Sequence, residues 1–189
     1  IRIIIENDIR ISLSDILALG NDGADIEDLK YFIHQRMKVF LRDQSLRHDL
    51  IDACLSLDEG NDLALSVKKS FALTDFIKTS DGANLIQGFK RANNILLQAE
   101  QKDGVEYSYG AESKYAEDGA EHNLFYALDN EEVKIRSALE REDFVEAMNS
   151  MANLRTPIDS FFETVQINSD VDVIRRNRLN LLSRICKLC

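Results

Sequence analysis

The run TPIDSFFETVQINSDVDVIRRNRLNLLSRICKL at residues 156–188 decides the fold, because it marks the starts of two helices and gives each an apolar face. Thr156-Pro157-x-Asp159 is typical of a helix start, with a hydroxyl N-cap, a proline in the first helical position and a carboxylate in the third. Ser169-x-x-Asp172 repeats this pattern before a second helix that we expect at 171–188. The sequence therefore predicts a helical C-terminal region.

The helix expected at 171–188 carries arginines on and beside its apolar face. At about 100° per residue, six apolar residues fall within one sector of roughly 120°: Val171, Ile174, Leu181, Leu182, Ile185 and Leu188. Arg178 falls inside this sector, and Arg175 lies at its edge. Because an unpaired buried charge is very costly, we expect Arg178 to have a partner in the core and Arg175 to face the surroundings.

Three blocks of the sequence stand in the order of a known family. They are FLRDQSLRHDLIDACL at 40–55, DGANLIQGFKRANNILLQAEQKDG at 81–104 and the final run. In this order they resemble the C-terminal part of bacterial glycyl-tRNA synthetase beta subunits, which holds a DALR anticodon-binding domain. Asp172-Val173-Ile174-Arg175 stands where the family usually has Asp-Ala-Leu-Arg, and Asn177-Arg178-Leu179 matches its Asn-Arg-Leu. The region 105–130 contains no matching motif.

The resemblance implies a function in attaching glycine to its tRNA. The chain would recognise the anticodon of a glycine tRNA, as part of a beta subunit in an alpha2beta2 tetramer with the alpha subunit. ATP and Mg would be used by the whole enzyme at the alpha subunit, with no cofactor in this segment, and the protein would be cytoplasmic. A glycine tRNA would present two cytosines in its anticodon, whose amino groups require a carboxylate or carbonyl acceptor.

The helix expected from Ser80-Asp81 to about Gln101 combines an apolar stripe with polar groups. Asn93 falls in the middle of the stripe formed by five residues: Leu85, Ile86, Phe89, Leu96 and Leu97. A buried amide must be hydrogen-bonded, so Asn93 and Arg178 are candidates for structural polar residues in the core, meeting each other or a backbone carbonyl. Neighbouring side chains are the candidates for an RNA-facing rim: Lys90, Arg91, Asn94 and Arg175.

The net charge of −10 is unexpected for an RNA-binding protein, whose affinity comes largely from phosphate contacts. Residues 100–146 contain 14 carboxylates against 5 Lys and Arg, a net of −9, so the rest of the chain carries only −1. We expect this acidic segment to face away from RNA or to repel wrong contacts. Arginines suit both phosphates and base edges. The basic cluster at 36–47 and its neighbour add three tRNA-binding candidates: Arg42, Arg47 and His48.

Helical periodicity extends over nearly the whole chain, and the sequence contains no convincing strand pair or repeat. We expect an all-α helical bundle with an irregular acidic insert at about 102–120. Residues 1–20 are expected to be the end of a preceding helical region and a linker, and 21–189 the anticodon-binding domain. Asp25-x-x-Asp28 predicts one further helix start. Since the chain begins at Ile1 without Met, we expect it to be a segment of a longer protein.

No constellation in the sequence predicts a catalytic residue, a metal site or a membrane span. His48-Asp49 lacks the further ligands of a metal-dependent phosphohydrolase, and Cys186-x-x-Cys189 is half a zinc site without a second pair. No run approaches the ~20 apolar residues of a membrane helix. Two alternatives remain open: a helical interaction module that docks the catalytic subunit without reading the anticodon, and an unrelated soluble helical adaptor.

Overall fold

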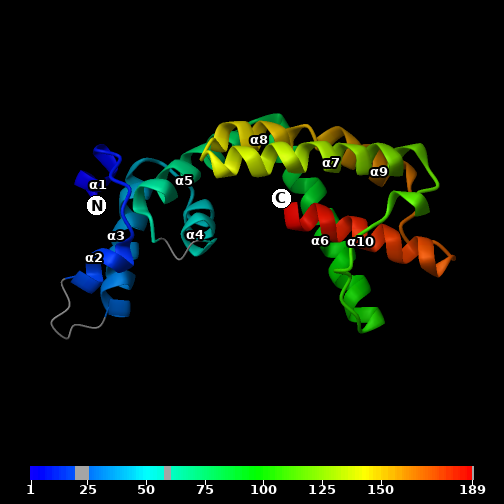
Figure 1. Cartoon of the computed structure of the whole chain (residues 1–189), viewed down its shortest axis with the longest axis horizontal. Coiled ribbons are helices and arrows are strands. Elements are labelled where there is room, and N and C mark those ends of the chain that lie inside the picture. The colour runs from blue at the N-terminus through cyan, green and yellow to red at the C-terminus, as the bar shows by residue number, and fades with distance from the viewer. Residues whose placement is uncertain (20–25, 58–60, 189) are drawn as a thin grey trace. The chain divides into compact units, whose positions relative to one another are not determined.

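The computed structural model describes residues 1–19, 26–57 and 61–188 (Figure 1). Over these ranges the chain is helical, with one isolated antiparallel bridge between Ser12 and Asp62 and no strand. The expected all-α class is therefore confirmed. The chain divides into two compact units, Ile1–Phe76 and Ile77–Cys189, which we describe separately. The boundary expected at residues 20 and 21 and the helix start expected at Asp25 lie outside the described residues.

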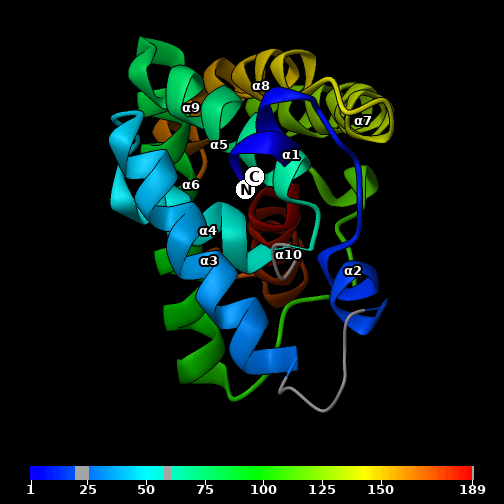
Figure 2. The same ribbon diagram turned by 90° about the vertical axis from the view of Figure 1, so that its left-hand side faces the viewer.

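The first unit is organised around α3, which packs against α2 and α4 (Figure 2). Its centre is formed by apolar side chains such as Met37, Leu41 and Ile51, each at most 1% exposed. The Asp62 carboxylate accepts a hydrogen bond from Leu65 N at 2.9 Å and so caps the helix that begins at Leu63. The helices that begin in this unit are α1 (Arg2–Glu6), α2 (Leu13–Leu19), α3 (Ile26–Asp43), α4 (His48–Leu57) and α5 (Leu63–Lys78).

The second unit holds the longest helices of the chain. They are α6 (Ser80–Asp103), the 3-10 helix η1 (Ser113–Tyr115), α7 (Gly119–Glu140), α8 (Phe144–Ala152), α9 (Arg155–Thr164) and α10 (Asp172–Leu188). In Figure 1, α7, α8 and α9 lie together, and α10 packs along α6 on one side of them. Phe161, Leu128 and Leu182 are fully buried between these helices.

The approach of α6 to α9 depends on a glycine. A Cβ atom added at Gly88 would lie 3.0 Å from the Cγ2 methyl of Ile158, whose side chain is only 1% exposed. This is closer than a carbon contact of about 3.5–4.0 Å. A side chain at residue 88 would therefore force Ile158 or one of the two helices to shift.

Helix starts agree with the sequence in part. The carboxylate of Asp143 caps α8 by accepting from Glu146 N at 2.9 Å. The expected N-cap at Thr156 is wrong: α9 begins at Arg155, because the carbonyl of Leu154 already accepts from Ile158 N at 3.0 Å. Proline is still tolerated at position 157, since the first-turn N–H groups have no partner within the helix.

The last helix begins at Asp172, one residue later than expected. The Ser169 hydroxyl accepts a hydrogen bond from Val171 N at 3.2 Å, and so supports the turn that leads into the helix. None of the helices in the described ranges is long and apolar enough to cross a lipid bilayer.

Candidate nucleic-acid interface

One exposed face of α6 combines cationic and amide side chains without a carboxylate. The sequence between Asp81 and Glu100 contains no acidic residue, although the chain as a whole has a net charge of −10. Arg, Lys, Asn and Gln supply the hydrogen bonds that proteins use for phosphates and base edges. The exposed polar residues of this face, called the α6 polar face below, are Gln87, Lys90, Arg91, Asn94, Gln98 and Gln101.

Three of the expected tRNA-binding residues lie together on this face: Lys90, Arg91 and Asn94. Arg91 is held in place by α9, because its guanidinium lies 4.5 Å from the centre of the Phe162 ring and its Nη2 donates to the Phe162 carbonyl at 3.4 Å. A guanidinium stacked on an aromatic ring is restricted in its rotamers and can still donate at its edge. Arg91 therefore presents a fixed positive charge beside Lys90.

Asn93 is not in the middle of the buried face, and that expectation is wrong. The buried face of α6 is centred on small residues, Gly88, Ala92 and Ala99, which pack against neighbouring helices. The expected stripe was placed wrongly because it was drawn through the large apolar residues alone. Leu97, which was counted in that stripe, is 45% exposed. Asn93 is only partly buried.

Arg178 is buried, at 6% exposed, and ion-paired with a carboxylate of α7. Its Nε and Nη2 donate to the two oxygens of Glu121 at 2.9 and 2.8 Å, and its Nη1 donates to the Gln166 carbonyl at 2.9 Å. Glu117 adds a weaker contact at 3.3 Å. Asn93 is not among these partners. Arg178 therefore joins α7, α10 and the turn before α10 from within the core.

Glu121 has two structural functions at once. Its carboxylate accepts from Glu117 N at 3.0 Å and Asp118 N at 3.2 Å, completing a capping box with Asp118 at the start of α7. Burial alone would raise the pKa of Glu121, but the hydrogen bonds from Arg178 and from these two backbone groups outweigh it and lower the pKa below its ordinary value. The carboxylate is thus held in its charged form.

Arg175 also makes its contacts within the protein. Its Nη2 donates to Asp103 at 2.7 Å, its Nη1 to the Tyr107 hydroxyl at 3.2 Å and its Nε to Asn168 at 3.3 Å. The hydrogen bond from Tyr107, and then the one from Arg175, lower the pKa of the Asp103 carboxyl. The Arg175 side chain is 21% exposed, and all three of its donor nitrogens are used in this network.

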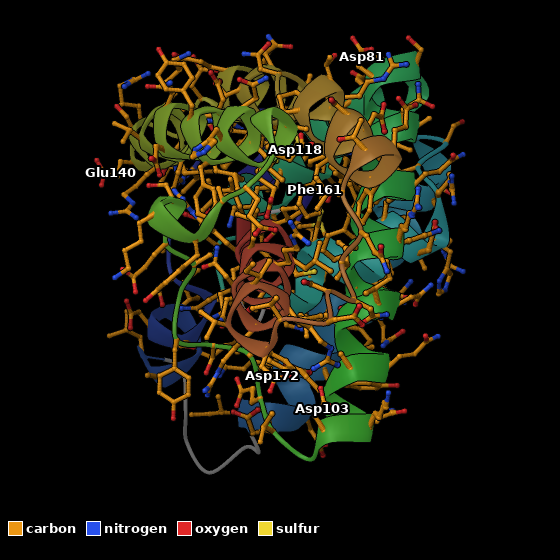
Figure 3. The ribbon with its side chains drawn as sticks, turned by 90° about the vertical axis from the view of Figure 1, so that its right-hand side faces the viewer. Asp81, Asp103, Asp118, Glu140, Phe161 and Asp172 are labelled. Atoms are coloured by element: carbon orange, nitrogen blue, oxygen red, sulfur yellow. The ribbon has the colours of Figure 1, made fainter. Side chains whose placement is uncertain are left out.

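Arg175 and the α6 polar face lie at different parts of α6. Asn94 and Asp103 are nine residues apart, which is about 13 Å along a helix. In Figure 3, Asp103 at the end of α6 lies near Asp172 at the start of α10. Arg175 therefore belongs to the end of α6, whereas Lys90, Arg91 and Asn94 belong to its middle.

The three candidates of the first unit lie at the end of α3 and the start of α4. All are exposed, and each has a local partner. Arg47 forms a two-bond pair with Asp49 at 3.1 and 2.6 Å, His48 Nδ1 lies 2.7 Å from Asp52, and Arg42 donates to the Lys38 carbonyl at 3.3 Å. Exposed pairs of this kind are weak and exchange readily with other partners.

A comparison with known families identifies the second unit. The sequence profile of the DALR anticodon binding domain matches residues 85–188, from α6 to the end of α10. The chain belongs to the DALR anticodon-binding domain family. Both the α6 polar face and the network of Arg175 and Arg178 lie within this DALR domain.

Relatives that resemble the chain over its full length are called Glycine--tRNA ligase beta subunit. The one from Ruegeria sp. (strain TM1040) is 58% identical over 189 residues, which are 100% of this chain and 28% of the relative. That from Paracoccus denitrificans (strain Pd 1222) is 55% identical, over 98% of this chain and 27% of its own length. That from Rhodospirillum centenum (strain ATCC 51521 / SW) is 42% identical with the same coverage. The expected resemblance is confirmed, and the chain spans about a quarter of these relatives.

The sequence assigns no structural function to Glu121 or to Asn177, although Asn177 belongs to the matched Asn-Arg-Leu motif. Asn177 is buried, and its amide donates to the Glu112 carbonyl at 3.0 Å and accepts from Glu112 N at 2.8 Å. The spacing Asp118-x-x-Glu121 is that of a capping box and could have indicated Glu121. The partner of Asn177, 65 positions earlier, carries no such signal.

Proposed function

We propose that this chain recognises the anticodon of a glycine tRNA and so supports the ATP-dependent attachment of glycine to that tRNA. The observation that carries the proposal is the match of the DALR anticodon binding domain to residues 85–188, within which the α6 polar face is exposed and free of carboxylates. The choice of glycine as the amino acid rests on the relatives, which are called Glycine--tRNA ligase beta subunit.

The proposed contacts follow from the chemistry of the side chains. Lys90 and Arg91 would bind phosphates or base edges, and Asn94 would bind a base edge, because these are the groups suited to each. Arg42, Arg47 and His48 would give a second, weaker set of tRNA contacts from the first unit. Glycine activation, with its ATP and Mg, would take place on a separate alpha subunit in a cytoplasmic alpha2beta2 tetramer.

Docking of the catalytic subunit is a second candidate function, favoured by one face of α7. Tyr126 and Val133 are seven residues apart, lie on the same side of the helix and are 73% and 69% exposed. Exposed apolar residues at this spacing are typical of a helix that packs against another protein. This face and the α6 polar face belong to different helices, so one domain can serve both functions.

Binding of glycine tRNA to the full-length protein at several salt concentrations tests the proposal. We expect Lys90→Ala to weaken binding and to lower the slope of log affinity against log salt by about 1, as for the loss of one phosphate contact. Lys187→Ala, an exposed lysine of α10, is the matched control and should leave the slope unchanged. Binding that responds neither to salt nor to a changed anticodon would overturn the proposal in favour of the docking function.

A further inference from the structure

Residues 104–118, called the bridging segment below, connect α6 to α7 without regular structure except for η1. In Figure 3 the segment runs from Asp103, past the start of α10, to Asp118. Three side chains of α10 hold it: Arg175 at its first part, Asn177 in its middle and Arg178 at its end. The insert expected from the sequence is therefore a fixed part of the domain.

Two residues of the bridging segment are anchored on either side of a short tip. Tyr107 is 5% exposed, receives a hydrogen bond from Arg175 and donates its hydroxyl to Asp103 at 2.6 Å, while its backbone N–H donates to Glu100 at 3.0 Å. Glu112 is held through both of its backbone groups by Asn177. Between these anchors lie only residues 108–111.

The tip presents an aromatic ring to the surroundings. Tyr109 is 86% exposed, the highest value among the exposed aromatic residues of the described chain. The next residue, Gly110, has φ +87°, a conformation that residues with a side chain rarely adopt. The anchors at Tyr107 and Glu112 restrict the backbone on both sides of Tyr109, and an exposed ring on a restricted backbone loses less conformational entropy when it binds a partner.

The chemistry around the tip favours a nucleotide base over a protein as the partner. The sequence neighbours of Tyr109 in the tip are Ser108, Gly110 and Ala111, none of which is a large apolar residue. A protein contact centred on an exposed tyrosine would require a contiguous apolar surface around the ring. A base needs only one aromatic face, because every base has a π-face of its own.

Two of the carboxylates beside the tip are paired, which reduces their repulsion of RNA, whereas Glu106 is exposed. Asp103 pairs with Arg175 at 2.7 Å, and Glu112 pairs with Lys114 at 2.5 Å. The four residues of the tip carry no charge. An approaching tRNA therefore meets a neutral tip within the acidic segment.

We propose that Tyr109 stacks on an unpaired base of the bound tRNA, and that Arg175 and Asn177 are positioning residues that act through the bridging segment. The inference rests on the proposed tRNA-binding function and adds the residue that stacks and the two that place it. Arg175, which the sequence analysis assigned to the tRNA-facing rim, then contributes by holding Tyr107.

Affinity of the full-length protein for glycine tRNA tests the stacking. Loss of one base stack weakens binding by roughly 5- to 150-fold, so we expect about a tenfold loss for Tyr109→Ala. Tyr109→Phe should bind like the unchanged protein, because the ring alone stacks. The salt slope should not change, since no phosphate contact is lost. Tyr31→Ala removes an exposed tyrosine from α3 and is the matched control.

The outcomes separate this inference from the proposed function. If tRNA binding still depends on salt and anticodon but Tyr109→Ala binds normally, the stacking is wrong and the proposed function stands. A loss in Tyr109→Phe equal to that in Tyr109→Ala would also overturn it, since the hydroxyl would then be responsible. If Tyr109→Ala weakens association with a catalytic subunit and not with tRNA, the tip is a protein contact. If the unchanged protein ignores the anticodon, both proposals fail.

A double-mutant cycle tests the positioning. We expect Asn177→Ala to weaken tRNA binding, and the further change Tyr109→Ala to add little, because both act through the same contact. Arg175→Lys is a milder variant that keeps the charge opposite Asp103, but its single nitrogen cannot reach the three partners that Nε, Nη1 and Nη2 of Arg175 contact. In Arg175→Gln, which removes the charge, the salt slope should be unchanged, whereas loss of a direct phosphate contact would lower the slope by about 1. Fully additive effects of Asn177→Ala and Tyr109→Ala would overturn the positioning.

Discussion

Replacing Arg178 by Met tests the buried ion pair that joins α7 to α10. Glu121 is fully buried and accepts four hydrogen bonds, two of them from Arg178. Removing one partner of a buried pair costs about 3–5 kcal/mol. Because two backbone donors would still serve Glu121, we expect the lower end of this range, about 3 kcal/mol.

This loss translates into a change in melting temperature. The second unit runs from Ile77 to Cys189, which is 113 residues, and unfolding entropy is about 2.1 cal/mol/K per residue near 60 °C. The resulting slope of about 0.24 kcal/mol/K converts 3 kcal/mol into about 13 °C. Urea unfolding and thermal unfolding of the chain measure the two quantities. Arg176→Met, an exposed arginine of the same helix, should change stability by less than about 0.5 kcal/mol.

The pH dependence of the free energy of unfolding is a second test of the Arg178–Glu121 pair. The pKa of Glu121 is below its ordinary value of 4.5, so the pair contributes stability above pH 4.5 that is lost as pH falls through the lowered pKa. In Arg178→Met, burial would raise the pKa of Glu121, and proton uptake would then stabilise the folded variant as pH falls. The difference between the two proteins should therefore be largest near pH 7 and shrink towards pH 4. A difference that is constant with pH, or smaller than about 1 kcal/mol, would refute the reasoning.

Three further substitutions test other contacts of the second unit by thermal unfolding. Gly88→Ala should destabilise by about 1–3 kcal/mol because its Cβ would meet Ile158 at 3.0 Å, whereas Gly119→Ala, with nothing within 4 Å, should be nearly neutral. Asp118→Ala should cost about 1 kcal/mol by removing the N-cap of α7, and an unchanged stability would show that the cap is dispensable. Asn93→Ala should change the free energy of unfolding by less than about 1 kcal/mol, because its side chain is only partly buried; a larger loss would restore it as a core residue.

The sequence predicts the helices of this protein well, because start signals and periodicity are local. The start of α10 lies one residue from the position predicted from Ser169 and Asp172. The error at Thr156 arises because Leu154 already ends one turn and begins the next helix, so that no side-chain cap is needed. Periodicity also placed Arg178 on a buried face correctly, since burial depends on the helix itself.

The candidate site is less predictable, because its contacts join distant parts of the chain. Arg178 meets Glu121 across 57 positions, and Arg175 meets Asp103 across 72. Residues so far apart in the sequence come into contact only when α6, α7 and α10 pack together. A single sequence carries no signal for that packing. The small residues of α6 were a further obstacle, because Ala92 and Ala99 define its buried face without being conspicuous in the sequence.

The most direct test of the central claim compares the affinity of the full-length protein for glycine tRNA with its affinity for the same tRNA carrying substituted anticodon cytosines. Both affinities must be measured at one salt concentration, because phosphate contacts contribute equally to the two. A well-made contact to a base edge is worth roughly 5- to 150-fold, so anticodon recognition predicts a loss of about tenfold or more for the substituted tRNA. Equal affinity for the two tRNAs would contradict it.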